Sequence, residues 1–126
     1  MQENYKQTIT RIFFEIRNNL YFYHLMTTNY ARHKAAGDIV TKFDTLIDNF
    51  LEQLYGKYNR PTNFRMFEIQ TKNNSDIEII NILNDYIQFL TNQLPKMLDI
   101  NDTNLLNIRD EMVGALNNTK YLFTLQ

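Results

Sequence analysis

The chain has 126 residues and a formal net charge of -1, from 13 Lys and Arg against 14 Asp and Glu. This length allows one domain with a single core, and the balanced charge argues against nucleic acid or an anionic membrane surface as the main partner. No stretch approaches the ~20 apolar residues of a membrane span, and we expect no signal peptide in the first ten residues. The absence of cysteine is typical of a reducing compartment, so we expect a cytoplasmic protein.

The first two apolar stripes along the chain predict a helical hairpin. The first stripe has apolar side chains that recur at helical spacing: Ile9, Ile12, Phe13, Ile16, Leu20 and Tyr23. The second has a spacing of 4, 3, 4, 3 and 4 residues, typical of a seam between antiparallel helices: Ala36, Val40, Phe43, Ile47, Phe50 and Leu54. A short turn around residues 26–29 separates them, where Thr28 or Asn29 can cap the second helix. Gly56, followed by Pro61, marks the end of that helix.

A connection of about 18 residues, from Gly56 to Asn74, separates the second helix from the third. At ~3.3 Å per extended residue it can cross a bundle from end to end. Its apolar side chains predict that it packs against the bundle, and a short helical turn would fit within it. These side chains are Phe64, Met66, Phe67 and Ile69.

Two further helices complete the pattern. The third opens on a capping-box sequence, Ser75 to Glu78, and Pro95 bends or ends it. Its predicted buried stripe is Ile77, Ile80, Leu83, Ile87, Leu90 and Leu94. The fourth begins near Asp102, with the predicted buried stripe Leu105, Ile108, Met112, Leu116 and Phe123. Four amphipathic helices of about 20–28 residues predict an all-α four-helix bundle as a single domain, residues 1–126.

Four residues are candidate metal ligands: the only two histidines, His24 and His33, and the pair Asp48 and Glu52. Asp48 and Glu52 are i, i+4 neighbours on one helix face. His33 precedes Asp48 by 15 residues, which is roughly 22 Å on one helix, so one chain cannot close both on the same ion. Two antiparallel copies across a two-fold axis could do so. Each of two symmetric sites would then take the histidines from one protomer and the carboxylates from the other.

Imidazole and carboxylate ligands suit Fe(II), Mn(II) or Zn(II), and open coordination positions suit oxygen chemistry. Gly37 falls in the same helical stripe, where its missing side chain would let another helix approach closely.

An interpretation without a metal site stays open. Asp48 and Glu52 would then form a solvated face, and His24 would be a hydrogen-bonded core residue. The protein would act as a non-enzymatic assembly or interaction module. Four tyrosines would be redox-active near iron or simply packed: Tyr21, Tyr23, Tyr30 and Tyr55.

Residues 24–33, HLMTTNYARH, and 48–52, DNFLE, resemble the Dps branch of the ferritin-like superfamily. That family has one histidine late in its first helix, a second early in the next helix, and Asp-x-x-x-Glu 15 residues further on. Residues 108–110 and 120–123 are similar to its final helix. The chain is also similar to small uncharacterised Dps-like proteins of large DNA viruses and phages, which implies host cytoplasm or virion as its location.

The resemblance implies a ferritin-like bundle with a long connection between the second and third helices. It implies a two-fold dimer, or a larger shell, that binds and oxidises Fe(II) at mono-iron or di-iron sites and sequesters the product. His24, His33, Asp48 and Glu52 would be the ligands, with no catalytic residue beyond them. A further aspartate of the family aligns with Gly37. No Glu in the chain has a His three residues later, which excludes the ferritin site built inside one bundle from Glu-x-x-His pairs.

Overall fold

The computed structural model describes residues 1–125 and is an all-α helical bundle, as predicted. Its elements are α1 (Glu3–Met26), α2 (Tyr30–Tyr58), α3 (Glu78–Gln88), the π-helical η1 (Phe89–Gln93), α4 (Leu94–Met97) and α5 (Thr103–Leu122). The elements α3, η1 and α4 follow one another without a break and form one helical segment. Across residues 1–125, no helix combines the length and apolarity needed to cross a membrane.

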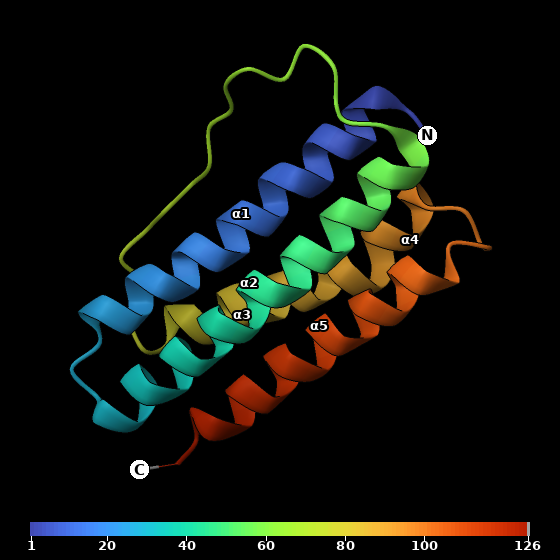
Figure 1. The fold of residues 1–126 in the computed structure, drawn as a ribbon. Helices are drawn as coiled ribbons and strands as arrows, with labels where there is room; N and C mark the ends of the chain where they lie inside the picture. Colours follow the sequence, from blue (N-terminus) through green and yellow to red (C-terminus); the bar gives the residue numbers. More distant parts are fainter. Residues whose placement is uncertain (126) are drawn as a thin grey trace.

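The direction of the helices follows from two different connections (Figure 1). A tight turn reverses the chain between α1 and α2, which lie antiparallel. The long segment between α2 and α3 runs back along α1, so α3 has the same direction as α2. The chain then reverses again into α5. Both the α1–α2 turn and the C-terminal end therefore lie at the same end of the bundle.

The predicted apolar stripes of α1 and α2 form a large part of the core, which buried residues of α3, η1, α4 and α5 complete. Ile9, Phe13, Ile16, Leu20 and Tyr23 are buried in α1, and all six stripe residues are buried in α2. Burying each such side chain contributes roughly 1.5–3 kcal/mol to folding. α2 packs on both α1 and α5 and is the central helix.

The ends of α2 are set by two asparagines. The side chain of Asn29 accepts a hydrogen bond from the backbone N–H of Arg32 at 3.0 Å, as an N-cap should. At the other end, Asn59 has a positive φ of 68° with an extended ψ of 159°, and this backbone conformation stops the helix. The predicted end at Gly56 is therefore slightly early.

The predicted capping box of the third helix is formed. The backbone N–H of Ser75 donates to the Glu78 carboxylate at 3.0 Å, and the N–H of Glu78 donates back to the Ser75 hydroxyl at 3.1 Å. The prediction that Ile77 is buried is wrong, because its side chain is 79% exposed. Ile77 lies inside the capping box, before the first turn of α3, where the chain has not yet reached the core.

Pro95 lies in the first turn of α4, directly after the π-helical turn η1. Proline lacks an N–H and its ring collides with the carbonyl one turn earlier in a regular α-helix. A π turn widens the backbone at that point, so the helical segment passes Pro95 and continues to Met97. The predicted bend thus takes the form of a local change in helix type.

In the structure the connection occupies residues 59–77 instead of Gly56 to Asn74, and it contains no helix before the turn that leads into α3. It lies along α1 (Figure 1) and is fixed there by side chains of that helix. Asn19 donates to the carbonyl of Gln70 at 2.7 Å, and the ring of Phe67 packs on Phe14 with centroids 5.5 Å apart. The connection therefore covers one side of α1 and leaves α2 free on that face.

Candidate functional site

His24 and His33 lie face to face across the α1–α2 turn. His24 is in the last turn of α1 and His33 in the first turn of α2. Their ring centroids are 4.0 Å apart and their planes differ by 15°. The hairpin predicted from the two apolar stripes brings them together, as expected.

Each histidine is held by the backbone of the other. The Nδ1 atom of His24 donates to the carbonyl oxygen of His33 at 2.7 Å, and Nδ1 of His33 donates to the carbonyl oxygen of His24 at 2.7 Å. Because a carbonyl oxygen only accepts, both Nδ1 atoms carry a proton, and the lone pair of each neutral ring is on Nε2. An Nδ1–H bond to a backbone carbonyl is how metal-binding histidines are commonly oriented. In the neutral form, each ring therefore keeps its free lone pair on Nε2.

Gly37 makes room for the His24 ring. A Cβ atom at position 37 would lie 2.9 Å from Cε1 and 3.0 Å from Nδ1 of His24. The expectation that this glycine admits another helix of a partner is therefore wrong, because the space is filled by a side chain of the same chain. An aspartate at this position, as the resemblance to Dps proteins would imply, could not be accommodated without moving His24.

Two tyrosines extend the histidine pair on its outer sides. The ring of Tyr21 stacks on His24 with centroids 5.9 Å apart, and the ring of Tyr30 lies 6.3 Å from that of His33. Tyr30 is 74% exposed. The four rings form a continuous aromatic surface at one end of the α1–α2 face.

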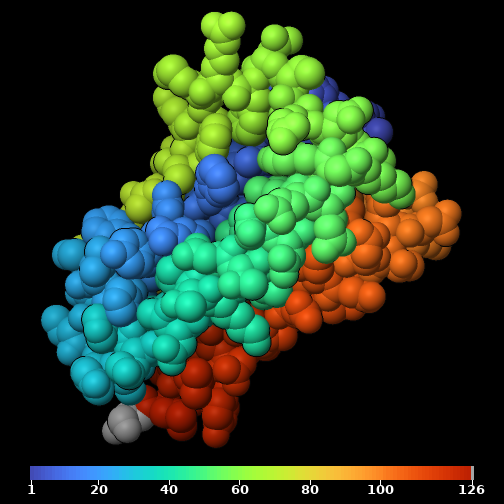
Figure 2. Space-filling model, in the orientation of Figure 1, coloured from blue at the N-terminus to red at the C-terminus, as the bar shows by residue number. Residues whose placement is uncertain are grey.

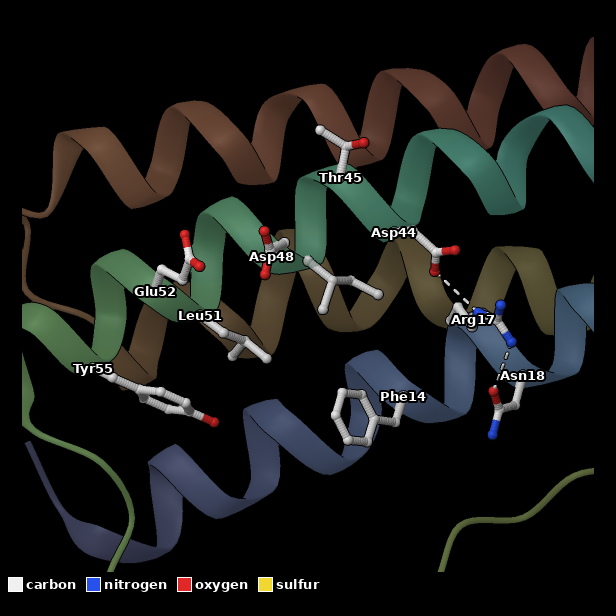
Figure 3. A pocket seen from close by; sticks show the side chains of 10 residues that line it. Phe14, Arg17, Asn18, Asp44, Thr45, Asp48, Leu51, Glu52 and Tyr55 are labelled. Atoms are coloured by element: carbon white, nitrogen blue, oxygen red, sulfur yellow. Dashed lines mark hydrogen bonds and ion pairs between the residues drawn. The ribbon is translucent and has the colours of Figure 1, made fainter.

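Asp48 and Glu52 lie further along α2, at the edge of a groove between α1 and α2 (Figure 3). The groove has a volume of about 790 Å³. Apolar side chains lie between the two helices there: Phe14, Ile47, Leu51 and Tyr55. Both carboxylates are exposed, and neither makes a hydrogen bond or ion pair with another side chain among residues 1–125.

Asp44, in contrast, is already paired. Its carboxylate accepts from Nε of Arg17 at 3.0 Å across the groove (Figure 3), and the Arg17 guanidinium lies over the Tyr21 ring at 4.8 Å. The ion pair is exposed and contributes at most about 1 kcal/mol. Its position matters more, because it separates the histidine end of the face from the Asp48 end.

One chain does not bring the four candidate ligands together. Within the described part of the chain, no three His, Asp or Glu side chains lie close enough to hold one ion. The histidines form one pair and the carboxylates another, at different positions along α2. A single protomer therefore supplies two half-sites on one face.

A buried polar cluster at the opposite end of the bundle was not predicted. Asp102 is fully buried, and its carboxylate accepts from Tyr58 Oη at 2.5 Å, from the N–H of Asp99 at 2.8 Å and from Nζ of Lys57. Burial raises the pKa of Asp102, but these donors outweigh it and hold the pKa below its usual value. The cluster ties the end of α2 to the turn before α5. In the sequence, only the position of Asp102 at a helix start was visible.

These features define the class of this protein: a helical bundle in which α1 and α2 together hold a histidine pair, and α2 alone holds an exposed carboxylate pair further along. The chain belongs to DUF5856, a family of unknown function, whose model matches residues 24–123. The match includes all four candidate ligands. No curated protein and no solved structure matches the chain.

Proposed function

We propose that this protein binds and oxidises Fe(II) at two sites shared between two-fold-related protomers, and sequesters the ferric product as a Dps-like ferritin. Each site would take His24 and His33 from one protomer, and Asp48 and Glu52 from its partner. The observation that carries the proposal is the reciprocal pair of Nδ1 bonds, which fixes both rings and leaves both Nε2 atoms as acceptors.

The direction of the helices supports a ferritin-like bundle. Bundles with a single long crossover, as in ferritin-like folds, have two successive helices in the same direction. Here α2 and α3 have the same direction, and residues 59–77 form the crossover along α1 (Figure 1). Simple up-and-down bundles with short turns do not have this arrangement.

A two-fold axis can bring the two half-sites of different protomers together. If α2 pairs with an antiparallel α2 about an axis midway between positions 33 and 48, each histidine pair faces the partner's carboxylates. Asp48 and Glu52 would neutralise the charge of Fe(II), and the neutral imidazoles would leave positions open for the oxidant. With hydrogen peroxide, two Fe(II) ions each give up one electron, and one peroxide with two protons becomes two waters.

A mixing experiment tests the shared site directly. The variant His24→Ala/His33→Ala and the variant Asp48→Asn/Glu52→Gln should each fail to oxidise Fe(II). When both are mixed, unfolded and refolded together, half of the dimers contain one of each chain, and each such dimer has one intact site of two. We expect the mixture to recover about a quarter of the wild-type rate.

Asp38→Asn is the matched control, because Asp38 is an exposed carboxylate of α2 outside the groove. It should oxidise Fe(II) at the wild-type rate. Full activity in either ligand variant alone would contradict the proposal. A mixture as inactive as its parents, although mixed dimers form, would show that the site is not shared.

One observation favours a second candidate function, a non-enzymatic assembly or interaction module. The reciprocal hydrogen bonds and the fit of His24 on Gly37 lock the α1–α2 turn even without a metal. The histidines would then be structural, with the carboxylates as solvated surface. A wild-type chain that forms dimers but binds no Fe(II) at micromolar concentration, in equilibrium dialysis, would favour this function.

A further inference from the structure

The charges of α2 are divided along its length. Residues 30–42 carry three cations, Arg32, Lys34 and Lys42, against the single anion Asp38. Residues 43–55 carry three anions, Asp44, Asp48 and Glu52, and no cation. A helix on its own is stabilised by the opposite order, with anions near its N-terminus and cations near its C-terminus. The stability of α2 therefore does not explain this distribution.

Part of this charge lies on the face that also holds the histidines. At ~100° per residue, Tyr30, His33 and Lys34 fall in the same helical stripe as Asp48 and Glu52. Lys34 is exposed, as are both carboxylates. Two copies of this stripe placed antiparallel would set Lys34 of each copy close to the carboxylate pair of the other.

The same face has an apolar projection at one end and an apolar recess at the other. Tyr30 is the projection, with 74% of its surface exposed. The recess is the groove of about 790 Å³, in which Phe14, Leu51 and Tyr55 lie. Figure 2 shows α1 set back between the connection and α2 on this side of the molecule. An exposed aromatic side chain and an open apolar groove on one face are both unfavourable in water.

The spacing relates the projection to the recess. Suppose that His33 of one copy faces Asp48 of the partner subunit. In an antiparallel pair of α2 helices, two residues then face each other when their numbers add to 81. Tyr30 then faces Leu51 of the partner subunit, inside the groove. Lys34 faces position 47, beside the partner's Asp48.

We infer that the α1–α2 face is a self-complementary interface in which Tyr30 of each copy occupies the groove of the other. The occupant of the groove is thus a second copy of this chain. The register, which is the alignment of the two α2 helices along each other, rests on the proposed function. It is taken from the shared histidine–carboxylate site. Tyrosine suits this position, since its ring is buried against apolar side chains while its hydroxyl reaches the polar rim.

The dimer dissociation constant tests the inference. Tyr30→Ser removes the ring from a highly exposed position, so the isolated chain should fold normally. We expect the dissociation constant, from sedimentation equilibrium without metal, to rise by about tenfold or more, as for a central aromatic anchor. Tyr121→Ser is the matched control, because Tyr121 is 62% exposed on α5, and it should leave the constant unchanged. Equal constants for the two variants would overturn the inference.

The register has its own test, because the chain has no cysteine. A Tyr30→Cys chain mixed with a Glu52→Cys chain should cross-link efficiently through a short bis-maleimide. Tyr30→Cys mixed with Tyr121→Cys should not. Efficient cross-linking of the Tyr30→Cys chain to itself would indicate parallel pairing and would overturn the inference.

The two proposals fail separately. If the wild type is a dimer that Tyr30→Ser weakens, yet Fe(II) is not oxidised, the interface stands and the proposed function fails. If the mixing experiment restores Fe(II) oxidation while Tyr30→Ser dimerises as well as the wild type, the function stands and Tyr30 does not occupy the groove. A wild-type monomer at millimolar concentration would contradict both.

Discussion

The His24 ring lies directly on the backbone of α2 at Gly37, where a Cβ atom would be 2.9 Å from Cε1 of the ring. This contact explains how two histidines on different helices can reach each other's carbonyl oxygens. The ring needs the space above α2, and only glycine leaves it open. Gly37 is therefore a positioning residue for the histidine pair.

Gly37→Ala should reveal this relationship through a double-mutant cycle. In a helix interior, Gly→Ala normally stabilises by about 1 kcal/mol. In the wild-type background the new methyl group displaces His24 and breaks its bond to His33, so we expect no gain or a net loss. In the His24→Ala background, the gain of about 1 kcal/mol should return. The measurement is urea denaturation of the four proteins.

Gly114→Ala is the control for that cycle. Gly114 lies inside α5, and nothing is within 4 Å of the Cβ position. It should stabilise both backgrounds equally by about 1 kcal/mol. If Gly37→Ala behaves in the same way as Gly114→Ala, the contact with His24 does not constrain the ring.

Asn19 should fix the connection to α1. Its buried amide donates to the carbonyl of Gln70, and its oxygen accepts from the N–H of Lys72 at 3.0 Å. Asn19→Ala removes both hydrogen bonds, so we expect a loss of about 1–3 kcal/mol and faster amide exchange in residues 59–77. Asn117→Ala, an exposed position on α5, should change neither. Unchanged exchange in the connection would show that other contacts hold it.

The Asp102 cluster should make stability depend on pH. Because the pKa of Asp102 is lower in the folded protein than in the unfolded chain, its contribution is fully present above the unfolded pKa of about 3.9. The contribution is lost as the pH falls below that value towards the folded pKa. Asp102→Asn should therefore destabilise at pH 7 and 5, and the difference from the wild type should shrink below about pH 4. Denaturation curves across this range would show a constant difference if the carboxylate had no altered pKa.

The parts of the structure that sequence could predict depend on contacts within about one helical turn. The stripes of α1 and α2, the cap at Asn29 and the box from Ser75 to Glu78 are of this kind, and all were found. The buried state of Asp102 was missed because its donors Lys57 and Tyr58 are more than 40 residues away. The π turn before Pro95 was missed because proline predicts a disturbance, not the form it takes.

The candidate site shows the same division. Proximity of His24 and His33 followed from the hairpin alone, since a three-residue turn brings the ends of two helices together. Their reciprocal bonds to carbonyl oxygens depend on side-chain geometry that spacing does not specify. Gly37 was placed on the correct face but given the wrong neighbour, because the missing side chain indicates space and not what fills it.

Metal binding and dimerisation should be linked, because each proposed site needs both protomers. Zn(II), which does not change oxidation state, should lower the dimer dissociation constant, and dimer formation should raise Zn(II) affinity by the same factor. At a free Zn(II) concentration 100 times the metal dissociation constant, each site would add about 2.7 kcal/mol to stability. His33→Ala and Asp48→Asn should each abolish the effect, and a chelator should reverse it in the wild type. Sedimentation and thermal unfolding with and without Zn(II) measure both sides of the linkage. Equal stabilisation of the wild type at dilutions where the chain is monomeric would show that one protomer binds the metal alone.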